Sequence, residues 1–250
     1  MKNLIGHLLL ASAAITGMAG GAAQAAIQLS STRVIMNEGE RHASVFAKNL
    51  SNDSYVVQAW IDGEAEEMDT PFFITPPLSR FDGGVERRLD ITRVAEKGLP
   101  GDRESYYWIN VLEIPQKKEA GPNNLVLTTR TRIKLFYRPA AIQKMPRGEG
   151  QLKWAWSRNG QACTLSIDNT SAYTVNFARI DIPGEAPGFG RTVIARPLDI
   201  TRIPLGKCPA AQTFSLTPSV VNDYGVLEVW PQVAVPPQGA SDDTAGAHAR

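Results

Sequence analysis

Few side chains in this 250-residue chain could do enzymatic chemistry. Beyond the first 25 residues the only histidines are His42 and His248, and a serine triad needs a histidine as its base. We expect His42, which follows Arg41 in a strand-like run, to lie on the surface. The H-E-x-x-H, G-x-S-x-G, G-x-x-x-x-G-K-[ST] and EF-hand patterns are absent. The sequence therefore gives no argument for an enzyme or for a bound cofactor.

The two cysteines, Cys163 and Cys208, offer either a disulfide or part of a metal site. A structural zinc site needs four ligands at close spacing, and the histidines are far from both cysteines in sequence. In an oxidising compartment, a disulfide that closes this loop would stabilise the fold by about 4 kcal/mol in the chain-entropy model. We therefore predict a disulfide between Cys163 and Cys208 and no metal site.

The segment from Leu125 to Arg138 has the pattern of a strand that could bind another chain. Its residues alternate with period two, so that Leu125, Leu127 and Thr129 share one face and basic side chains such as Lys134 point the other way. At strand spacing the segment would span roughly 46 Å, which is too long for one sandwich core. Either a bulge divides it into two buried pieces, or its first half is an exposed edge that recruits a strand from a partner.

The first 25 residues have the features of a secretory signal peptide. Lys2 precedes a mostly apolar run from Leu4 to Met18, and Ala23-Gln24-Ala25 fits an A-x-A cleavage site. A membrane anchor is the alternative, but polar residues and glycines interrupt the run and no stop-transfer charges follow. We predict that the mature chain begins near Ala26.

Removal of the signal peptide takes away Lys2 and leaves 25 basic residues (26 − 1) against 25 acidic residues. A net charge of zero gives no reason to expect nucleic acid or an anionic membrane as a partner. No later stretch is apolar for long enough to insert into a membrane as a helix. We therefore expect the mature protein to be free in its compartment.

The elements that must position these residues are short strands in two blocks. Runs rich in β-branched and aromatic residues alternate with turn residues over 26–143 and again over 151–235. This pattern predicts an all-β fold with two immunoglobulin-like sandwiches, and a Greek-key barrel is the nearest alternative for the first block. Residues 144–150 are expected to form the linker, and residues 236–250 are expected to form a mobile tail.

Several short blocks of residues occur in an order that is typical of one family. They are Ser31-Thr32-Arg33-Val34-Ile35, Gln58-Ala59-Trp60-Ile61, Pro71-Phe72-Phe73-Ile74-Thr75-Pro76-Pro77-Leu78, Leu99-Pro100-Gly101-Asp102-Arg103-Glu104-Ser105, Trp108-Ile109-Asn110-Val111, Glu113-Ile114-Pro115, Ile133-Lys134-Leu135-Phe136-Tyr137-Arg138-Pro139 and Asn222-Asp223-Tyr224-Gly225. In these blocks the chain resembles the PapD-like periplasmic chaperones of the chaperone–usher pilus pathway. The resemblance implies two immunoglobulin-like domains in an angled, boomerang arrangement with a cleft between them.

The resemblance also implies how a partner would be bound. Arg33 and Lys134 match the family's cleft pair, which anchors the C-terminal carboxylate of a pilin subunit. Leu125, Leu127 and Thr129 match the strand that family chaperones lend to an incomplete pilin, an established form of strand addition called donor-strand complementation. The family often has a larger apolar residue in the place of Thr129, so one pocket of the subunit would be filled less well here.

A second set of residues matches the family's buried interdomain charge network: Glu104, Arg138 and Asp223. Its implied role is to fix the angle between the domains, because desolvation offsets much of the attraction between buried charges. The segment 116–124 is short and lacks cysteines, and in this it resembles the short-loop branch of the family, which serves rod-like pili.

The function we expect is that of an ATP-independent periplasmic chaperone without a cofactor. It would bind and stabilise a pilin or fimbrial subunit and deliver it to an outer-membrane usher. The alternative is a secreted two-domain adhesin or ligand-binding module on the same fold. Such a module would bind a glycan or a protein without help from Arg33 and Lys134.

Overall fold

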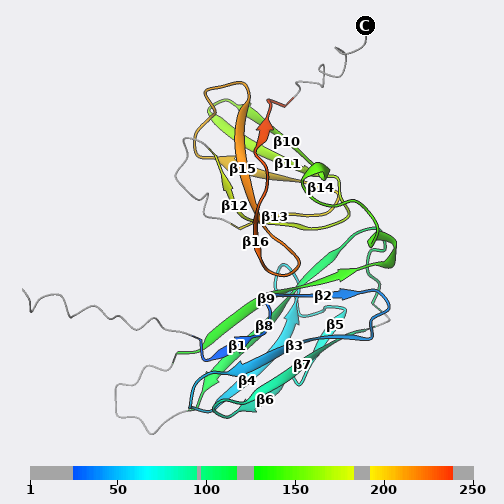
Figure 1. Cartoon of the computed structure of the whole chain (residues 1–250), viewed down its shortest axis with the longest axis vertical. Coiled ribbons are helices and arrows are strands. Elements are labelled where there is room, and N and C mark those ends of the chain that lie inside the picture. Colours follow the sequence, from blue (N-terminus) through cyan, green and yellow to red (C-terminus); the bar gives the residue numbers. More distant parts are fainter. Residues whose placement is uncertain (1–24, 95–96, 117–126, 183–191, 239–250) are drawn as a thin grey trace, which may run out of the picture.

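The structure is a computed structural model that describes residues 25–94, 97–116, 127–182 and 192–238. These residues form two β-sandwiches joined at an angle, with two short 3₁₀ helices, η1 (Ala140–Ile142) and η2 (Glu149–Gln151), in the connection (Figure 1). The predicted all-β class with two immunoglobulin-like sandwiches is confirmed. In the described part of the chain, no helix is long and apolar enough to cross a membrane. The predicted signal peptide falls almost wholly in residues 1–24, outside the described residues.

The first sandwich contains two sheets, with strand orders β1-β3-β7-β5 and β2-β9-β8-β4-β6. Its strands are β1 (Ile27–Leu29), β2 (Arg33–Asn37), β3 (His42–Asn49), β4 (Tyr55–Asp62), β5 (Phe72–Thr75), β6 (Leu78–Phe81), β7 (Glu86–Arg93), β8 (Ser105–Pro115) and β9 (Thr129–Arg138). Alternate residues of each strand face the space between the sheets, as in β3, where Val45 and Ala47 are fully buried and the residues beside them are exposed. Apolar alternation therefore sets both the strand period and the position of the core.

The first strands of the chain change sheets, and this creates an open edge. β1 pairs with β3 in one sheet, whereas β2 pairs in parallel with β9 in the other. β2 covers only the second half of β9, from Lys134 to Arg138. The first half, Thr129 to Ile133, pairs with β8 on one side and with no described strand on the other.

The strand pattern predicted for Leu125–Arg138 starts later than expected. β9 begins at Thr129, and Leu127 lies before it with 66% of its surface exposed. Leu125 lies outside the described residues. From Ile133 the predicted alternation holds, because Ile133, Leu135 and Tyr137 all belong to the core of the first sandwich.

The second sandwich has one sheet of order β10-β11-β14 and another of order β13-β12-β15-β16, with β17 also paired to β15. Its strands are β10 (Leu152–Asn159), β11 (Ala162–Asn169), β12 (Val175–Asp181), β13 (Val193–Ala195), β14 (Asp199–Leu205), β15 (Phe214–Val221), β16 (Leu227–Val229) and β17 (Val233–Val235). Its core is separate from the first and contains Trp154, Leu165 and Phe177. Each sandwich therefore has its own apolar core, as expected of a domain.

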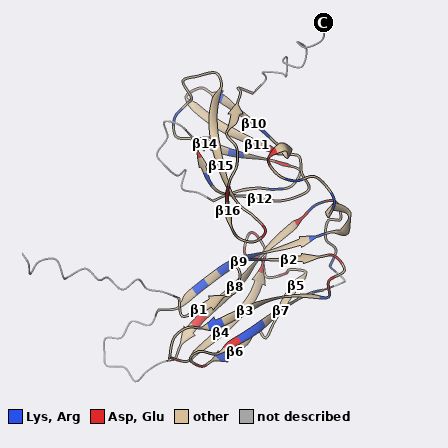
Figure 2. Ribbon diagram, viewed as in Figure 1, with Lys and Arg blue, Asp and Glu red and all other residues tan. Residues whose placement is uncertain are grey.

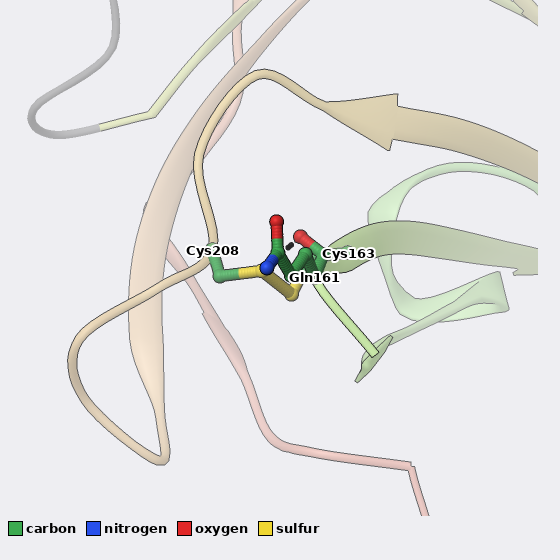
Figure 3. Close-up of a disulfide and its surroundings, with 3 residues drawn as sticks. All are labelled: Gln161, Cys163 and Cys208. Carbon is green, nitrogen blue, oxygen red and sulfur yellow. Dashed lines mark hydrogen bonds between the residues drawn. A yellow bond between two sulfur atoms is a disulfide. The ribbon is translucent and has the colours of Figure 1, made fainter. Parts of the chain in front are cut away.

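A disulfide links Cys163 at the start of β11 to Cys208 beyond the end of β14, as predicted (Figure 3). The Cα atoms are 5.2 Å apart, and the carbonyl oxygen of Gln161 lies 3.4 Å from Cys208 Sγ. Because β11 and β14 are neighbours in one sheet, the bond ties the loop after β14 to an adjacent strand.

The tail expected from residue 236 needs a correction. The backbone N–H of Trp156 donates to Pro236 O at 3.0 Å, and that of Gln238 donates to Trp156 O at 2.7 Å. Pro236–Gln238 therefore continues the second sandwich alongside β10, because its backbone groups find partners there. Residues 239–250 lie outside the described part of the chain.

Candidate functional site

A pair of cations lies where β2 and β9 face the second sandwich. Arg33 and Lys134 are direct partners in the parallel register of these strands, so their side chains leave the sheet side by side. The guanidinium of Arg33 donates from Nη1 to Val221 O at 2.8 Å, and Lys134 Nζ donates to Asn176 Oδ1. Val221 and Asn176 belong to the second sandwich and help line an open pocket of about 500 Å³ that Arg138 and the linker residues Arg147–Gly150 also border. The structure thus brings Arg33 and Lys134 together at the domain boundary.

No carboxylate of the described residues forms a salt bridge with this pair, although the charges of Asp223 and Glu104 act on Arg33 from farther away. Among the described residues, neither Arg33 nor Lys134 forms a salt bridge, and Nε of Arg33 is buried without a hydrogen-bond partner. Lys134 is only 7% exposed, and burial together with the positive charge of Arg33 lowers the pKa of its ammonium group to about 8. Burial also lowers the pKa of Arg33. Two desolvated cations side by side favour the binding of an anion, and a carboxylate can accept hydrogen bonds from both.

Sequence reasoning did not find the side chains that surround the cations. The ring of Trp108, directly opposite Lys134 in the β8–β9 register, lies 5.3 Å from Lys134 Nζ and 4.8 Å from the guanidinium of Arg132. Arg132 and Arg130 both bind the buried carboxylate of Asp62, at 3.1 and 2.9 Å. Figure 2 shows the row of cations along β9 that results. The period-two basic pattern predicted this row, but nothing in the sequence identified Asp62 as its partner.

Two of the three predicted donor residues, Leu127 and Thr129, lie at the beginning of this row. Thr129 is exposed and opens β9, and Leu127, also exposed, comes just before it. Because the edge from Thr129 to Ile133 has no described partner on one side, its N–H and C=O groups could pair with a strand of another chain. The open edge leads directly to Lys134. The role of Leu125 and Leu127 in filling a partner's groove stays a prediction.

Four residues beyond Lys134, the guanidinium of Arg138 joins the two domains. Its Nε donates to Glu104 Oε1 at 2.7 Å, and its two terminal nitrogens bind both carboxylate oxygens of Asp223 at 2.7 and 2.8 Å. Glu104 is 3% exposed and also accepts the backbone N–H of Thr174, in the second domain, at 2.9 Å. Arg147, which the sequence did not identify, adds a bond to Asp223 at 2.6 Å. The structure therefore brings Glu104, Arg138 and Asp223 into one network across the boundary.

The pKa values in this network follow from burial and pairing. Burial raises the pKa of Glu104, and Arg138 offsets part of that cost. Burial alone would raise the pKa of Asp223, but hydrogen bonds from Arg138 and Arg147 lower it to about 2. Burial alone would lower the pKa of Arg138, but its bonds with Asp223 and Glu104 raise it above the usual value. Asp223 is therefore ionised near neutral pH, and Arg138 keeps its proton.

The turn that carries Asp223 depends on its glycine. Gly225 has φ +80° and lies so close to the first domain that an added Cβ would clash with Thr32 Oγ1. Oδ1 of Asn222 accepts the backbone N–H groups of Tyr224 and Val226, each at 3.0 Å, and shapes the turn. These local features place the Asp223 carboxylate against Arg138.

A second ion pair crosses the domain boundary at another point. Arg196, just after β13, binds the carboxylate of Glu64, just after β4. Both side chains are about half exposed, so the pair contributes little to stability in water. No sequence motif marks either residue, and only the fold brings them together.

The chain therefore has two β-sandwich domains joined by a buried arginine network. A pair of cations without a salt bridge lies next to an open strand edge. These features can be compared with those of known protein families. Residues 26–143 match the family model "Pili and flagellar-assembly chaperone, PapD N-terminal domain", and residues 148–229 match "Pili assembly chaperone PapD, C-terminal domain". The chain therefore belongs to the PapD-like family of fimbrial chaperones of the chaperone–usher pathway.

Individual relatives are similar over most of their length. The chain is 34% identical over 223 residues to the probable fimbrial chaperone LpfB of Escherichia coli O157:H7, covering 83% of this chain and 86% of LpfB. It is 38% identical over 192 residues to the chaperone protein FimB/FhaD of Bordetella pertussis, covering 72% and 77%. The crystal structure of the YadV chaperone superposes with a TM-score of 0.67 at 31% identity, covering 84% of this chain and all of that one.

Proposed function

We propose that the protein is a periplasmic chaperone that binds an incomplete pilin or fimbrial subunit by donor-strand complementation and delivers it to an outer-membrane usher. The observation that carries the proposal is the continuity of the open edge of β9 with the cation pair Arg33 and Lys134. A subunit strand added along Thr129–Ile133 would end beside two cations that form no salt bridge within the described part of the chain. The C-terminal carboxylate of that strand would supply the missing charge.

Each part of the site contributes differently to binding. Backbone pairing along the open edge gives affinity with little sequence preference, and the side chains that point into the subunit give specificity. Burial of Leu125 and Leu127 would contribute roughly 3–6 kcal/mol before ordering costs are subtracted. In this proposal the first domain spans 26–143, the linker 144–150 and the second domain 151–235. The network of Glu104, Arg138 and Asp223 fixes the angle between the domains.

Replacement of Lys134 tests the proposal. Wild-type protein and Lys134→Ala are co-purified from the periplasm with pilin subunits that are either full-length or shortened at the C-terminus. We expect a stoichiometric complex for the wild type with the full-length subunit, and at least tenfold less complex when either Lys134 or the subunit terminus is missing. Lys153→Ala is the matched control, because Lys153 is an exposed lysine on a strand of the other domain.

Two results would contradict the proposal. Undiminished capture by a folded Lys134→Ala protein would remove the anchor role from the cation pair. If the well-folded wild type formed no complex with any strand-deficient subunit, the adhesin or ligand-binding alternative would take its place.

A further inference from the structure

The beginning of β1 is held by a buried carboxylate of the opposite sheet. The backbone nitrogen of Ala26 donates to Glu113 Oε2 at 2.8 Å, and that of Ile27 donates to the same oxygen at 3.1 Å. Glu113 is 3% exposed, and its other oxygen, Oε1, is buried without a hydrogen-bond partner. Among the described residues no lysine or arginine forms a salt bridge with it. The described part of the chain therefore gives this carboxylate neither a positive partner nor a donor for Oε1.

The predicted cleavage site lies at the nitrogen that Glu113 already binds. A leader-cleaving protease would hydrolyse the Ala25–Ala26 amide with one water molecule: the hydroxyl goes to the Ala25 carbonyl carbon and the hydrogen to the Ala26 nitrogen. At neutral pH that nitrogen takes up another proton and becomes an ammonium group with three N–H donors, since the ordinary pKa of an α-amino group is about 7.7–8.0. We propose that the α-ammonium group of Ala26, made by cleavage after Ala25, forms an ion pair with the buried carboxylate of Glu113.

The contacts that would hold this ammonium group are already present in the structure. The carbonyl of Ala26 accepts the backbone N–H of Leu50 at 2.8 Å, and Ile27 is paired with Asn49 in the β1–β3 register. Ile27 is itself 4% exposed, so its side chain anchors the strand in the core. Cleavage therefore need not move the nitrogen, and the additional N–H groups form on an atom that already contacts this carboxylate, whose Oε1 lacks a donor.

The ion pair would also bear on the open edge of β9. Glu113 is the β8 residue paired with Thr129, where β9 begins, whereas β1 belongs to the other sheet. A mature N-terminus held at Glu113 keeps β1 paired with β3 and away from the free edge of Thr129–Ile133. The ion pair itself does not depend on the proposed function, but this effect on the edge does.

The experiment measures the pKa of the α-amino group in the mature chain that starts at Ala26. The carbonyl ¹³C resonance of Ala26 is followed by NMR through a pH titration in wild type, Glu113→Gln and Glu86→Gln. We expect a pKa about one unit or more above the ordinary value in the wild type and in Glu86→Gln, whose altered side chain is exposed on β7. In Glu113→Gln the pKa should return to about 7.7–8.0.

A chain that retains Ala25 provides a second test with every side chain of the fold in place. It keeps the Ala26 N–H bond to Glu113 but moves the ammonium group by one residue, so its α-amino pKa should be ordinary and its urea midpoint lower than that of the mature chain. An ordinary α-amino pKa in the mature wild type would overturn the proposal. So would equal values in wild type and Glu113→Gln; if that variant does not fold, equal values in the mature and Ala25-retaining chains decide against it.

Discussion

Lys134 and Arg138 lie on the same face of β9, four residues apart, but their charges are balanced differently. Arg138 binds two carboxylates, those of Glu104 and Asp223, through three hydrogen bonds of 2.7–2.8 Å. Lys134 is more buried, yet its partners are the neutral amide of Asn176 and the face of Trp108, with a second cation beside it. Arg138 is therefore a cation whose carboxylate partners are present (the filled site), and Lys134 is a cation without a carboxylate partner (the unfilled site).

The difference separates what holds the domains together from what can bind a partner. A desolvated charge is costly unless it is paired, so Arg138 can join two domains only because both carboxylates are supplied from within the chain. The unpaired Lys134 carries a cost in the free protein that an incoming carboxylate would relieve. The geometry of β9 thus puts the interdomain arginine and the proposed carboxylate-binding lysine on the same face, four residues apart.

The largest effect, on the free energy of unfolding, should come from removing Arg138. Arg138→Ala leaves Glu104 buried without its counter-charge, so we expect the free energy of unfolding to fall by about 3–5 kcal/mol in urea denaturation. Lys134→Ala is the matched comparison and should change it by less than about 1 kcal/mol, because it removes a desolvated charge that no carboxylate balances. Equal losses for the two variants would mean that the sites do not differ in this way.

The next largest effect, on the affinity for the subunit, should come from placing a carboxylate beside Lys134. In Asn176→Asp, a carboxylate replaces the amide that accepts the hydrogen bond from Lys134. It should pair with Lys134 and compete with the subunit terminus, so we expect affinity for the subunit to fall about 10- to 100-fold without loss of stability. Binding is measured by titration with a subunit peptide. Asn159→Asp, an exposed asparagine on β10, should bind like the wild type, and normal binding by Asn176→Asp would show that Lys134 does not receive the carboxylate.

A smaller effect should appear as a difference in pH dependence. Because the pKa of Lys134 is lowered to about 8, the native state binds fewer protons than the unfolded chain as pH rises from 8 toward 10.5, and the contribution of Lys134 to stability increases over that window. Subunit binding should change in the opposite direction and weaken up to about tenfold at pH 9, because the uncharged amine no longer attracts a carboxylate.

The contact between Arg138 and Asp223 should not change over this pH range, because Asp223 titrates at a pKa of about 2 and Arg138 keeps its proton. Lys134→Arg, whose guanidinium stays charged, should give a flat binding profile between pH 7 and pH 9. A wild-type profile that is equally flat would place the titration of Lys134 outside the binding step.

The sequence predicted the features that depend on a single strand, such as which residues of β9 face the core and which face away from it. Period-two order located Ile133, Leu135 and Tyr137 in the core and the basic residues on the other face, because alternation is a local property. It did not predict that Asn176 meets Lys134, that Asp62 binds two arginines or that Glu113 receives the start of β1. Those contacts join strands distant in sequence, and they depend on register and on the docking of the domains, which no local pattern contains.

The smallest effect should distinguish the buried and exposed partners of one carboxylate. Asp223 binds Arg138, whose side chain is 12% exposed, and Arg147, whose side chain is 53% exposed, at similar distances of 2.7 and 2.6 Å. Solvent screens the exposed pair, so Arg147→Ala should lower the free energy of unfolding by less than about 1 kcal/mol in urea, several times less than Arg138→Ala. If Arg147→Ala were as costly as Arg138→Ala, distance rather than burial would decide the strength of these contacts, and the contrast between Lys134 and Arg138 would lose its physical basis.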